Sequence, residues 1–222
     1  MKKYLPVGLL LAFLLFAAAP AQAVRISWNF ACGLDRSNFK FTTYGPVDIL
    51  LDESSGNLRI HSNSFGGISG LAGGWISSLF KVRGDFEISV DYQLNKAIDY
   101  GSFVQFFLPD YILVRSYDNY HVYIGSWPPS GWPTSDMSGT IRYVRTGSDV
   151  STYVNNDLVY TYHGYGTGDV DVAFGPHADS GGGWGGGSLD VSFDNLVITA
   201  ASLVDYTSHF LPAILPLLLG AD

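Results

Sequence analysis

The chain has few of the residues that several classes of protein require. Cys32 is its one cysteine, so no internal disulfide can form and stability must come from packing or a bound metal. Twelve Lys and Arg stand against twenty Asp and Glu, a net charge of −8 at pH 7. Nucleic acids and anionic membrane surfaces attract basic proteins, so the composition argues against both as partners.

Recognisable catalytic motifs are also missing. The segment around Ser69 lacks the second glycine of a nucleophile elbow, and the five histidines show no metal-ligand spacing. No phosphate-binding glycine loop or dinucleotide fingerprint occurs. These absences incline the interpretation away from an enzyme without deciding the question.

No apolar run reaches the roughly 20 residues needed to span a bilayer. Leu9–Ala19 is the longest clear run, and it follows Met1-Lys2-Lys3 and precedes Ala21-Gln22-Ala23. A positive start, an apolar stretch and an A-x-A site predict a signal peptide over 1–23, cleaved after Ala23. An uncleaved anchor is the alternative. The prediction places the mature chain outside the cytoplasm (secreted, periplasmic or at the cell surface), without a transmembrane segment.

Helical periodicity is nearly absent downstream, whereas two-residue alternation recurs. From 85 to 94, five apolar residues alternate with polar ones, which predicts a strand with one buried face. Turn residues such as Arg83-Gly84-Asp85 separate further β-rich runs. Strands are expected at 57–62, 75–82, 85–94, 102–108, 111–117, 120–125, 140–146, 150–155, 158–163, 169–174 and 189–194.

This pattern predicts an all-β fold, a two-sheet antiparallel sandwich. We expect a single domain over 24–205, with the glycine-rich segment 181–187 as a loop inside it. The tail, 206–222, contains an apolar stretch interrupted by Pro212 and Pro216. We expect it to pack on the domain or on a partner chain, and self-association through this tail is the corresponding prediction.

Three segments resemble a known family. The first is Gly84–Tyr92, the second combines Thr140–Ser148 with Val150–Asn156, and the third is Val191–Ile198. They are similar to structural strands of the concanavalin A-like lectin/glucanase superfamily, which includes laminin-G-like modules. The resemblance implies a jelly roll of two curved antiparallel sheets that binds or cleaves carbohydrate on its concave face or rim loops.

The glucanases of that superfamily carry Glu, Asp and Glu at alternating positions of one strand, and this chain lacks that motif. Glu87 and Asp91 are four residues apart with Ser89 between them. Glycoside hydrolysis needs two carboxyl groups at a defined separation, and aspartates on different strands could still supply them.

Aromatic residues give the main indication of a ligand surface. Trp127 and Trp132 lie in a proline-rich loop, and a third tryptophan, Trp184, lies in the glycine-rich segment. Flat rings beside polar acceptors suit sugars. Packing against the sandwich is the alternative for all of them. The predicted carbohydrate-binding residues are Trp127, Trp132, Tyr117, Tyr120, Tyr123, Asp118, Asn119 and Trp184.

No cofactor is required by the sequence, and structural calcium is the one metal considered. Candidate ligands lie at Asp118-Asn119, Asn155-Asn156-Asp157 and Asp194-Asn195, because loop carboxylates and amides suit Ca²⁺. Such residues also occur in turns without any metal.

The leading functional hypothesis is an exported, lectin-like domain that binds a glycan or polysaccharide without catalysis. A second hypothesis is a structural or adhesive surface protein that associates through sheet edges or through the tail. A third is a polysaccharide glycosidase or lyase with an aspartate pair that sequence motifs do not reveal.

Overall fold

The computed structural model describes residues 23–45, 48–62, 71–95, 102–106, 112–115, 121–124, 130–133, 137–179 and 190–205. Every regular element in these residues is a strand, and every strand pair is antiparallel, which confirms the all-β prediction. The strands are β1 Val24–Trp28, β2 Phe39–Tyr44, β3 Ile49–Asp52, β4 Leu58–Ser62, β5 Leu71–Leu94, β6 Ser102–Phe106, β7 Ile112–Arg115, β8 His121–Ile124, β9 Ser130–Pro133, β10 Ser138–Thr146, β11 Asp149–Val154, β12 Asp157–Tyr162, β13 Val170–Asp179 and β14 Asp190–Val204.

Strand β5 is long enough to belong to both layers of the sandwich. Its first half pairs with β2 and β13, and its second half pairs with β10 and β14. Gly84, with a φ of 74°, lies between the two halves. The sequence-based prediction of a turn at 83–85 is therefore wrong. The glycine allows the strand to continue from one layer into the other instead of reversing it.

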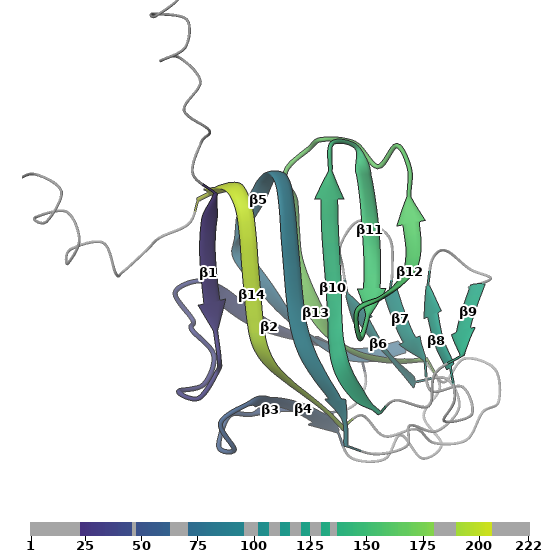
Figure 1. The fold of residues 1–222 in the computed structure, drawn as a ribbon. Coiled ribbons are helices and arrows are strands. Elements are labelled where there is room, and N and C mark those ends of the chain that lie inside the picture. The colour runs from purple at the N-terminus through teal and green to yellow at the C-terminus, as the bar shows by residue number, and fades with distance from the viewer. Residues whose placement is uncertain are drawn as a thin grey trace, which may run out of the picture.

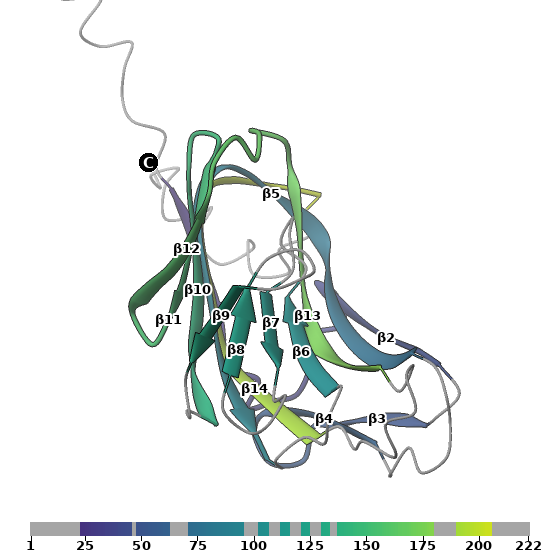
Figure 2. The same ribbon diagram turned by 90° about the vertical axis from the view of Figure 1, so that its right-hand side faces the viewer.

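Two layers result, and Figures 1 and 2 show them from two sides. One follows the order β12-β11-β10-β5-β14-β1, and β14 also pairs with β4, which carries β3. The other follows β2-β5-β13-β6-β7-β8-β9. This is the two-sheet antiparallel jelly roll that the sequence predicts.

The core lies between the layers and follows the predicted alternation. On β5 the apolar set from Phe86 to Leu94 is buried, while Glu87 and Gln93 face outward. Phe193 and Ile198 of β14 are 1% and 0% exposed, and Phe193 meets Phe174 of β13 with ring centroids 5.0 Å apart. Burial of this apolar surface supplies the main driving force for folding.

A buried arginine also crosses the core. Arg145 on β10 is 1% exposed, and its guanidinium lies over the Phe86 ring, 4.6 Å from the centroid. The guanidinium donates to the carbonyl of Gly84 and, at 2.6 Å, to that of Gly168. Burial lowers the pKa of Arg145 from its ordinary value, and Asp85 opposes that shift. The side chain ties β10 to the crossing point of β5.

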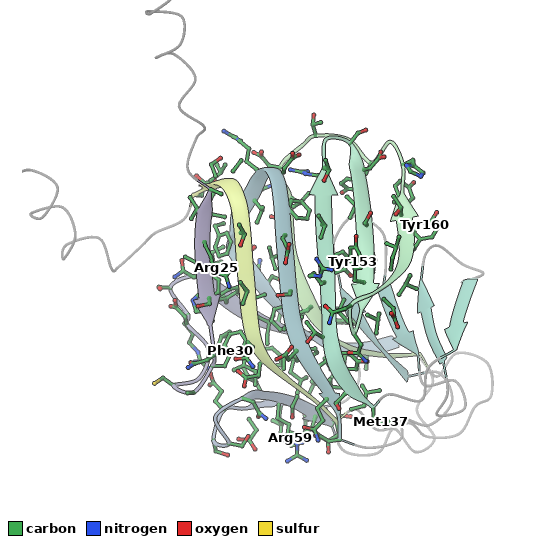
Figure 3. All side chains as sticks on the ribbon, viewed as in Figure 1. Arg25, Phe30, Arg59, Met137, Tyr153 and Tyr160 are labelled. Atoms are coloured by element: carbon green, nitrogen blue, oxygen red, sulfur yellow. The ribbon has the colours of Figure 1, made fainter. Side chains whose placement is uncertain are left out.

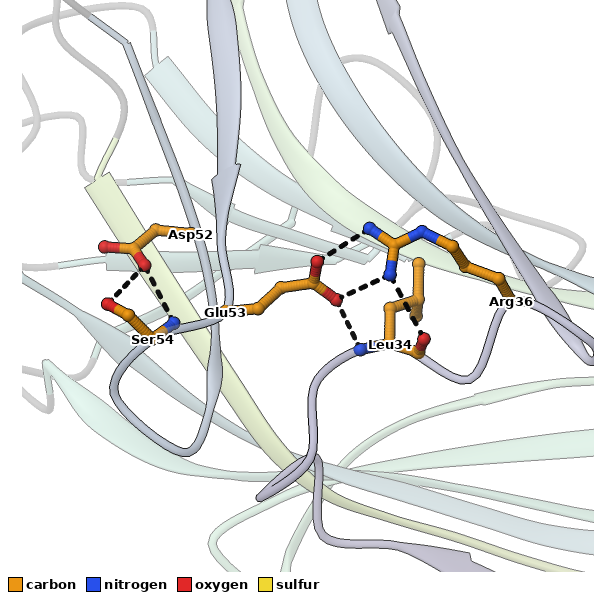
Figure 4. Close-up of polar contacts among 5 residues, drawn as sticks. All are labelled: Leu34, Arg36, Asp52, Glu53 and Ser54. Atoms are coloured by element: carbon orange, nitrogen blue, oxygen red, sulfur yellow. Dashed lines mark hydrogen bonds and ion pairs between the residues drawn. The ribbon is translucent and has the colours of Figure 1, made fainter.

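Hydrogen bonds to Glu53 fix the loop after β1. The Glu53 carboxylate accepts the backbone N–H of Leu34 at 2.5 Å and a forked pair of hydrogen bonds from Arg36, at 3.1 and 2.6 Å (Figure 4). The hydrogen bond from Arg36 lowers the pKa of Glu53, and partial burial opposes this effect. Glu53 therefore holds the loop against the turn between β3 and β4.

Both chain ends of the sequence-based scheme lie outside the described residues. The signal peptide and the packing of the apolar tail stay predictions. So does the self-association that we expect through the tail. The assignment of a single domain over 24–205 stays one too, although β1 to β14 fall within it. Among the described residues, no helix is long and apolar enough to cross a membrane.

Candidate functional site

A depression of about 390 Å³ lies where the end of β5 is flanked by β10 and β14. Its lining mixes polar and apolar surface, and includes two aspartates and several hydroxyl and amide groups. The lining residues are Asn57, Asp91, Tyr92, Gln93, Ser138, Gly139, Thr140, Ser192, Phe193, Asp194 and Asn195. A site of this composition can hold a hydroxyl-rich ligand through hydrogen bonds.

Two carboxylates meet in this depression because their strands are paired. Asp91 on β5 lies directly opposite Asp194 on β14, and Thr140 on β10 lies opposite Asp91 on its other side. All three side chains are partly exposed. Opposed residues on neighbouring antiparallel strands share one face of the sheet, so both carboxylates face the same opening.

Hydrogen bonds orient the Asp91 carboxylate at both of its oxygens. The Thr140 hydroxyl donates to Oδ1 at 2.5 Å, and the Asn195 amide Nδ2 donates to Oδ2 at 2.9 Å. Asp194 accepts the backbone N–H of Asn195 at 2.8 Å. Asp91 is therefore held by groups on the two neighbouring strands, and Asp194 by the backbone of the next residue.

The bulge in β14 gives the site its shape. The register against β5 shifts between Asp194 and Val197, and Asn195 has a φ of 50°. Asparagine tolerates this left-handed region better than most residues with a side chain. Phe193 and Leu196 remain in the core, so Asp194 and Asn195 both face outward. Bulges recur beside functional sites because they redirect side chains in this way.

An ion pair fixes the start of β14 next to the site. Arg59 on β4 donates two hydrogen bonds to Asp190, each at 2.7 Å, and Asp190 is 4% exposed. Asn95 bridges Asp190 and Ser192, at 3.0 and 2.8 Å. The hydrogen bond from Arg59 lowers the pKa of Asp190, while burial opposes this shift. The end of β5 is thus secured to β14.

The other flank is secured by Asn155. Its side-chain Oδ1 accepts the backbone N–H of Thr140, and its own N–H donates to the Thr140 carbonyl, both at 3.0 Å. At Gly139 a Cβ atom would lie 1.9 Å from that Oδ1 atom, so the glycine leaves the room the asparagine needs. Thr140 is therefore held beside Asp91 by two hydrogen bonds to the end of β11.

Most of the predicted carbohydrate-binding residues lie outside the described part of the chain. This holds for Tyr117, Asp118, Asn119, Tyr120, Trp127 and Trp184. Trp132 and Tyr123 fall on the paired strands β9 and β8, where Trp132 lies opposite Val122 and Tyr123 opposite Gly131. Their roles stay predictions.

Sequence reasoning did not pair Asp91 with Asp194. It considered Asp91 only beside Glu87, and Asp194 only as a calcium ligand. A usable signal was present, since each aspartate follows a core aromatic or aliphatic residue within an alternating strand. The sequence pattern does not contain the register between β5 and β14, and this register is what brings the two aspartates together.

Two of the three predicted calcium sites lie in described residues, and one does not. Asn155 and Asn156 have positive φ values of 51° and 73° and form the tight turn between β11 and β12, where Asn residues fit without a metal. Asp118 and Asn119 lie outside the described residues. Among those that are described, no group of three or more His, Cys, Asp or Glu could hold a metal ion.

The fold is similar to those of solved carbohydrate-cleaving enzymes. The β-glucanase of Bacillus licheniformis matches with a TM-score of 0.57 at 11% identity, over 79% of this chain and 97% of that one. The laminarinase of Flavobacterium sp. UMI-01 matches with a TM-score of 0.56 at 14% identity, over 81% and 99%. A GlcNAcα1-4Gal-releasing endo-β-galactosidase from Clostridium perfringens matches with a TM-score of 0.56 at 12% identity, over 80% and 62%.

These likenesses confirm the concanavalin A-like jelly-roll fold, and at such identities they establish the fold alone. No family model matches the chain, and no curated protein does. The hypothesis of a lectin-like domain without catalysis is nevertheless contradicted. The structures named above are glycoside hydrolases, so the resemblance on which that hypothesis rested favours the glycosidase alternative.

Proposed function

We propose that this protein is a glycoside hydrolase that acts on polysaccharides, with Asp91 and Asp194 as its carboxyl pair. The observation that carries the proposal is the direct opposition of these two residues on adjacent strands, at the depression of about 390 Å³. The fold shared with glucanases and laminarinases supports the same reaction class.

The expected spacing of the pair suits this chemistry. Opposed residues on antiparallel strands have Cβ atoms about 4.5–5.5 Å apart. Retaining glycosidases hold their two carboxyl groups about 5–5.5 Å apart, close enough for one of them to attack the sugar directly. Because each carboxyl carbon is one bond beyond its Cβ, a cross-strand aspartate pair can bring its two carboxyl groups to a separation of this order.

The hydrogen bonds suggest how the roles are divided. Asp91 has both oxygens oriented by Thr140 and Asn195, as a nucleophile or base needs. Asp194 is then the acid that donates a proton to the glycosidic oxygen as the bond to the leaving sugar breaks. The sugar carbon forms its new bond to Asp91. Water then attacks this carbon, gives a proton to the Asp194 carboxylate and displaces Asp91 from the sugar.

The proposed location agrees with this activity. The predicted signal peptide directs the chain out of the cytoplasm, and polysaccharides are encountered outside it. Glycan is thus the proposed partner, and the acidic net charge of −8 favours a neutral glycan over an anionic one.

Release of reducing sugar from a panel of β-glucans, galactans and mucin-type glycans tests the proposal. We expect activity on at least one of them, and Asp91→Asn and Asp194→Asn should each lower kcat by at least about a hundredfold. Asp171→Asn is the matched control, because Asp171 is exposed, lies outside the depression and makes only a long ion pair, 3.8 Å, with Lys81.

The possible failures can be told apart. Activity that survives in Asp91→Asn and Asp194→Asn would keep the hydrolase and reject this carboxyl pair. Silence of the folded wild-type protein on the whole panel would refute the function. Thermal unfolding of each variant shows whether a loss of activity reflects chemistry or folding.

Structural calcium stays a prediction, and Asp194-Asn195 is its one described candidate that is not a simple hairpin turn. Bound calcium would stabilise the folded state by mass action. The expected result is a higher Tm in millimolar Ca²⁺ than in EDTA. Equal Tm values in the two buffers would remove calcium from consideration.

A further inference from the structure

Strand β12 exposes more apolar surface than its neighbours. Six large hydrophobic side chains are exposed among the described residues, and three of them belong to this six-residue strand. They are Leu158, Tyr160 and Tyr162, with exposed fractions of 51%, 42% and 39%. Apolar side chains gathered in this way mark contact surfaces more often than scattered ones do.

β12 is also an edge. In the described part of the chain it pairs with β11 and with no other strand, and Figure 1 shows it at the border of its layer. An edge strand presents backbone N–H and C=O groups that another strand can pair with. β9, which ends the strand order on the other side, contains Pro133, a residue that blocks such pairing. β12 has no proline, glycine, lysine or arginine.

Three tyrosines form one cluster, two of them on β12 and the third, Tyr165, shortly after it. The Tyr160 and Tyr162 rings have centroids 6.4 Å apart, and Tyr165 meets Tyr162 edge-on at 6.0 Å. Figure 3 shows Tyr160 directed away from the strand. Thr161 points to the opposite face, where its hydroxyl lies 2.9 Å from that of Ser151. The two tyrosines therefore share one face of the free edge.

We propose that β12 pairs antiparallel with β12 of a second copy of this chain, about a two-fold axis at Thr161. In this register Tyr160 of each copy lies opposite Tyr162 of the other. Four tyrosines then gather on one face, and cross-strand aromatic pairs are among the favourable ones. A surface that is complementary to itself is the requirement for a two-fold dimer.

Charge and strand geometry agree with this occupant. The facing residues Tyr160, Thr161 and Tyr162 are uncharged, so no like charges meet across the centre of the proposed strand pair. The register shift in β12 near Val159 limits the pairing to a short segment. A short interface of this kind gives a concentration-dependent dimer instead of an obligate one.

Sedimentation of the whole purified chain over a concentration series to about 100 μM tests the association. The wild-type mass should rise from one chain toward two. Tyr160→Lys should remain monomeric, because an edge lysine opposes pairing. Leu50→Lys is the matched control: Leu50 is 54% exposed on β3, another edge strand, and this variant should associate like the wild type.

Cysteine cross-linking tests the register independently of the lysine variants. In a Cys32→Ser background, Thr161→Cys should form an intermolecular disulfide with itself, because the axis places it opposite its own copy. Tyr160→Cys alone should cross-link poorly, but a mixture of Tyr160→Cys and Tyr162→Cys should cross-link efficiently.

The proposal is overturned by a wild-type monomer at every concentration, or by equal effects of Tyr160→Lys and Leu50→Lys. It is also overturned when Thr161→Cys cross-links no faster than Tyr160→Cys. Loss of polysaccharide capture by Tyr160→Lys, with a monomeric wild type, would instead assign the cluster to glycan binding. None of these outcomes depends on the proposed hydrolase activity.

Discussion

Replacement of Arg145 by methionine is the most direct test of how the two layers are joined. The guanidinium is 1% exposed and donates to the carbonyls of Gly84 and Gly168. Methionine fills much of the same space but donates nothing. A buried polar group that loses its partner costs about 1–3 kcal/mol, and water can replace the guanidinium at the exposed Gly168 but less readily at the half-buried Gly84. We therefore expect a loss of about 2 kcal/mol in the free energy of unfolding, out of the roughly 5–15 kcal/mol of a typical domain.

Arg142→Met provides the comparison on the same strand. Arg142 faces outward, with Glu87 at 3.7 Å and its guanidinium 4.0 Å from the centroid of the Tyr153 ring. Exposed ion pairs and exposed cation–π contacts contribute at most about 1 kcal/mol each. We therefore expect Arg142→Met to cost about 1 kcal/mol.

Urea unfolding followed by tryptophan fluorescence measures both variants. The urea midpoint should fall further for Arg145→Met than for Arg142→Met, with the slope unchanged if the denatured state is unaffected. Equal midpoints for the two variants would refute the reasoning. They would mean that the carbonyls of Gly84 and Gly168 do not depend on the buried guanidinium.

Three further outcomes are expected. The hydrogen bonds from Arg59 hold the pKa of Asp190 below its ordinary value. The stability that this ion pair contributes is therefore present above the unfolded-state pKa of about 3.9, and it is lost as the pH falls through the folded-state pKa. The free energy of unfolding should thus fall on acidification below about pH 4, and less steeply in Asp190→Asn; identical pH profiles would exclude the pair as a cause. Gly175→Ala should lower the Tm far more than Gly168→Ala, since a Cβ at 175 would lie 1.9 Å from a backbone oxygen, whereas nothing lies within 4 Å of one at 168 and its φ is not positive. Calorimetry decides between them, and similar Tm losses would contradict the close approach. Thr140→Val, which keeps the shape but removes the hydroxyl that orients Asp91, should lower kcat about tenfold or more with little change in KM, and unchanged steady-state kinetics would reject this role.

Local pattern was sufficient to predict which side chains form the core. Phe86, Ile88 and Val90 were placed there by two-residue alternation, and all three are at most 4% exposed. The same pattern could not tell how the strand continues at Gly84. A glycine with positive φ fits a turn as well as a crossing between layers, and only pairing with distant strands distinguishes them.

The candidate site was out of reach for the same reason. Its aspartates are far apart in the sequence, and their meeting depends on the register of β5 against β14. The aromatic loop residues proposed as ligand contacts, such as Trp127, were chosen by residue type alone. Residue type indicates what a side chain can bind, but it contains no information on which partners the fold brings to it.

The site depends on the bulge in β14 for the amide of Asn195, whereas its two carboxylates meet through the register of two strands. In the glucanase motif, alternation along one strand is enough to put the acids on one face. Here, unbroken alternation after Phe193 would turn Asn195 inward and Leu196 outward. The bulge instead leaves Asp194 and Asn195 both outside and returns Leu196 to the core. The bulge thus adds the amide that orients Asp91 to the face on which Asp194 already lies, without exposing a core residue.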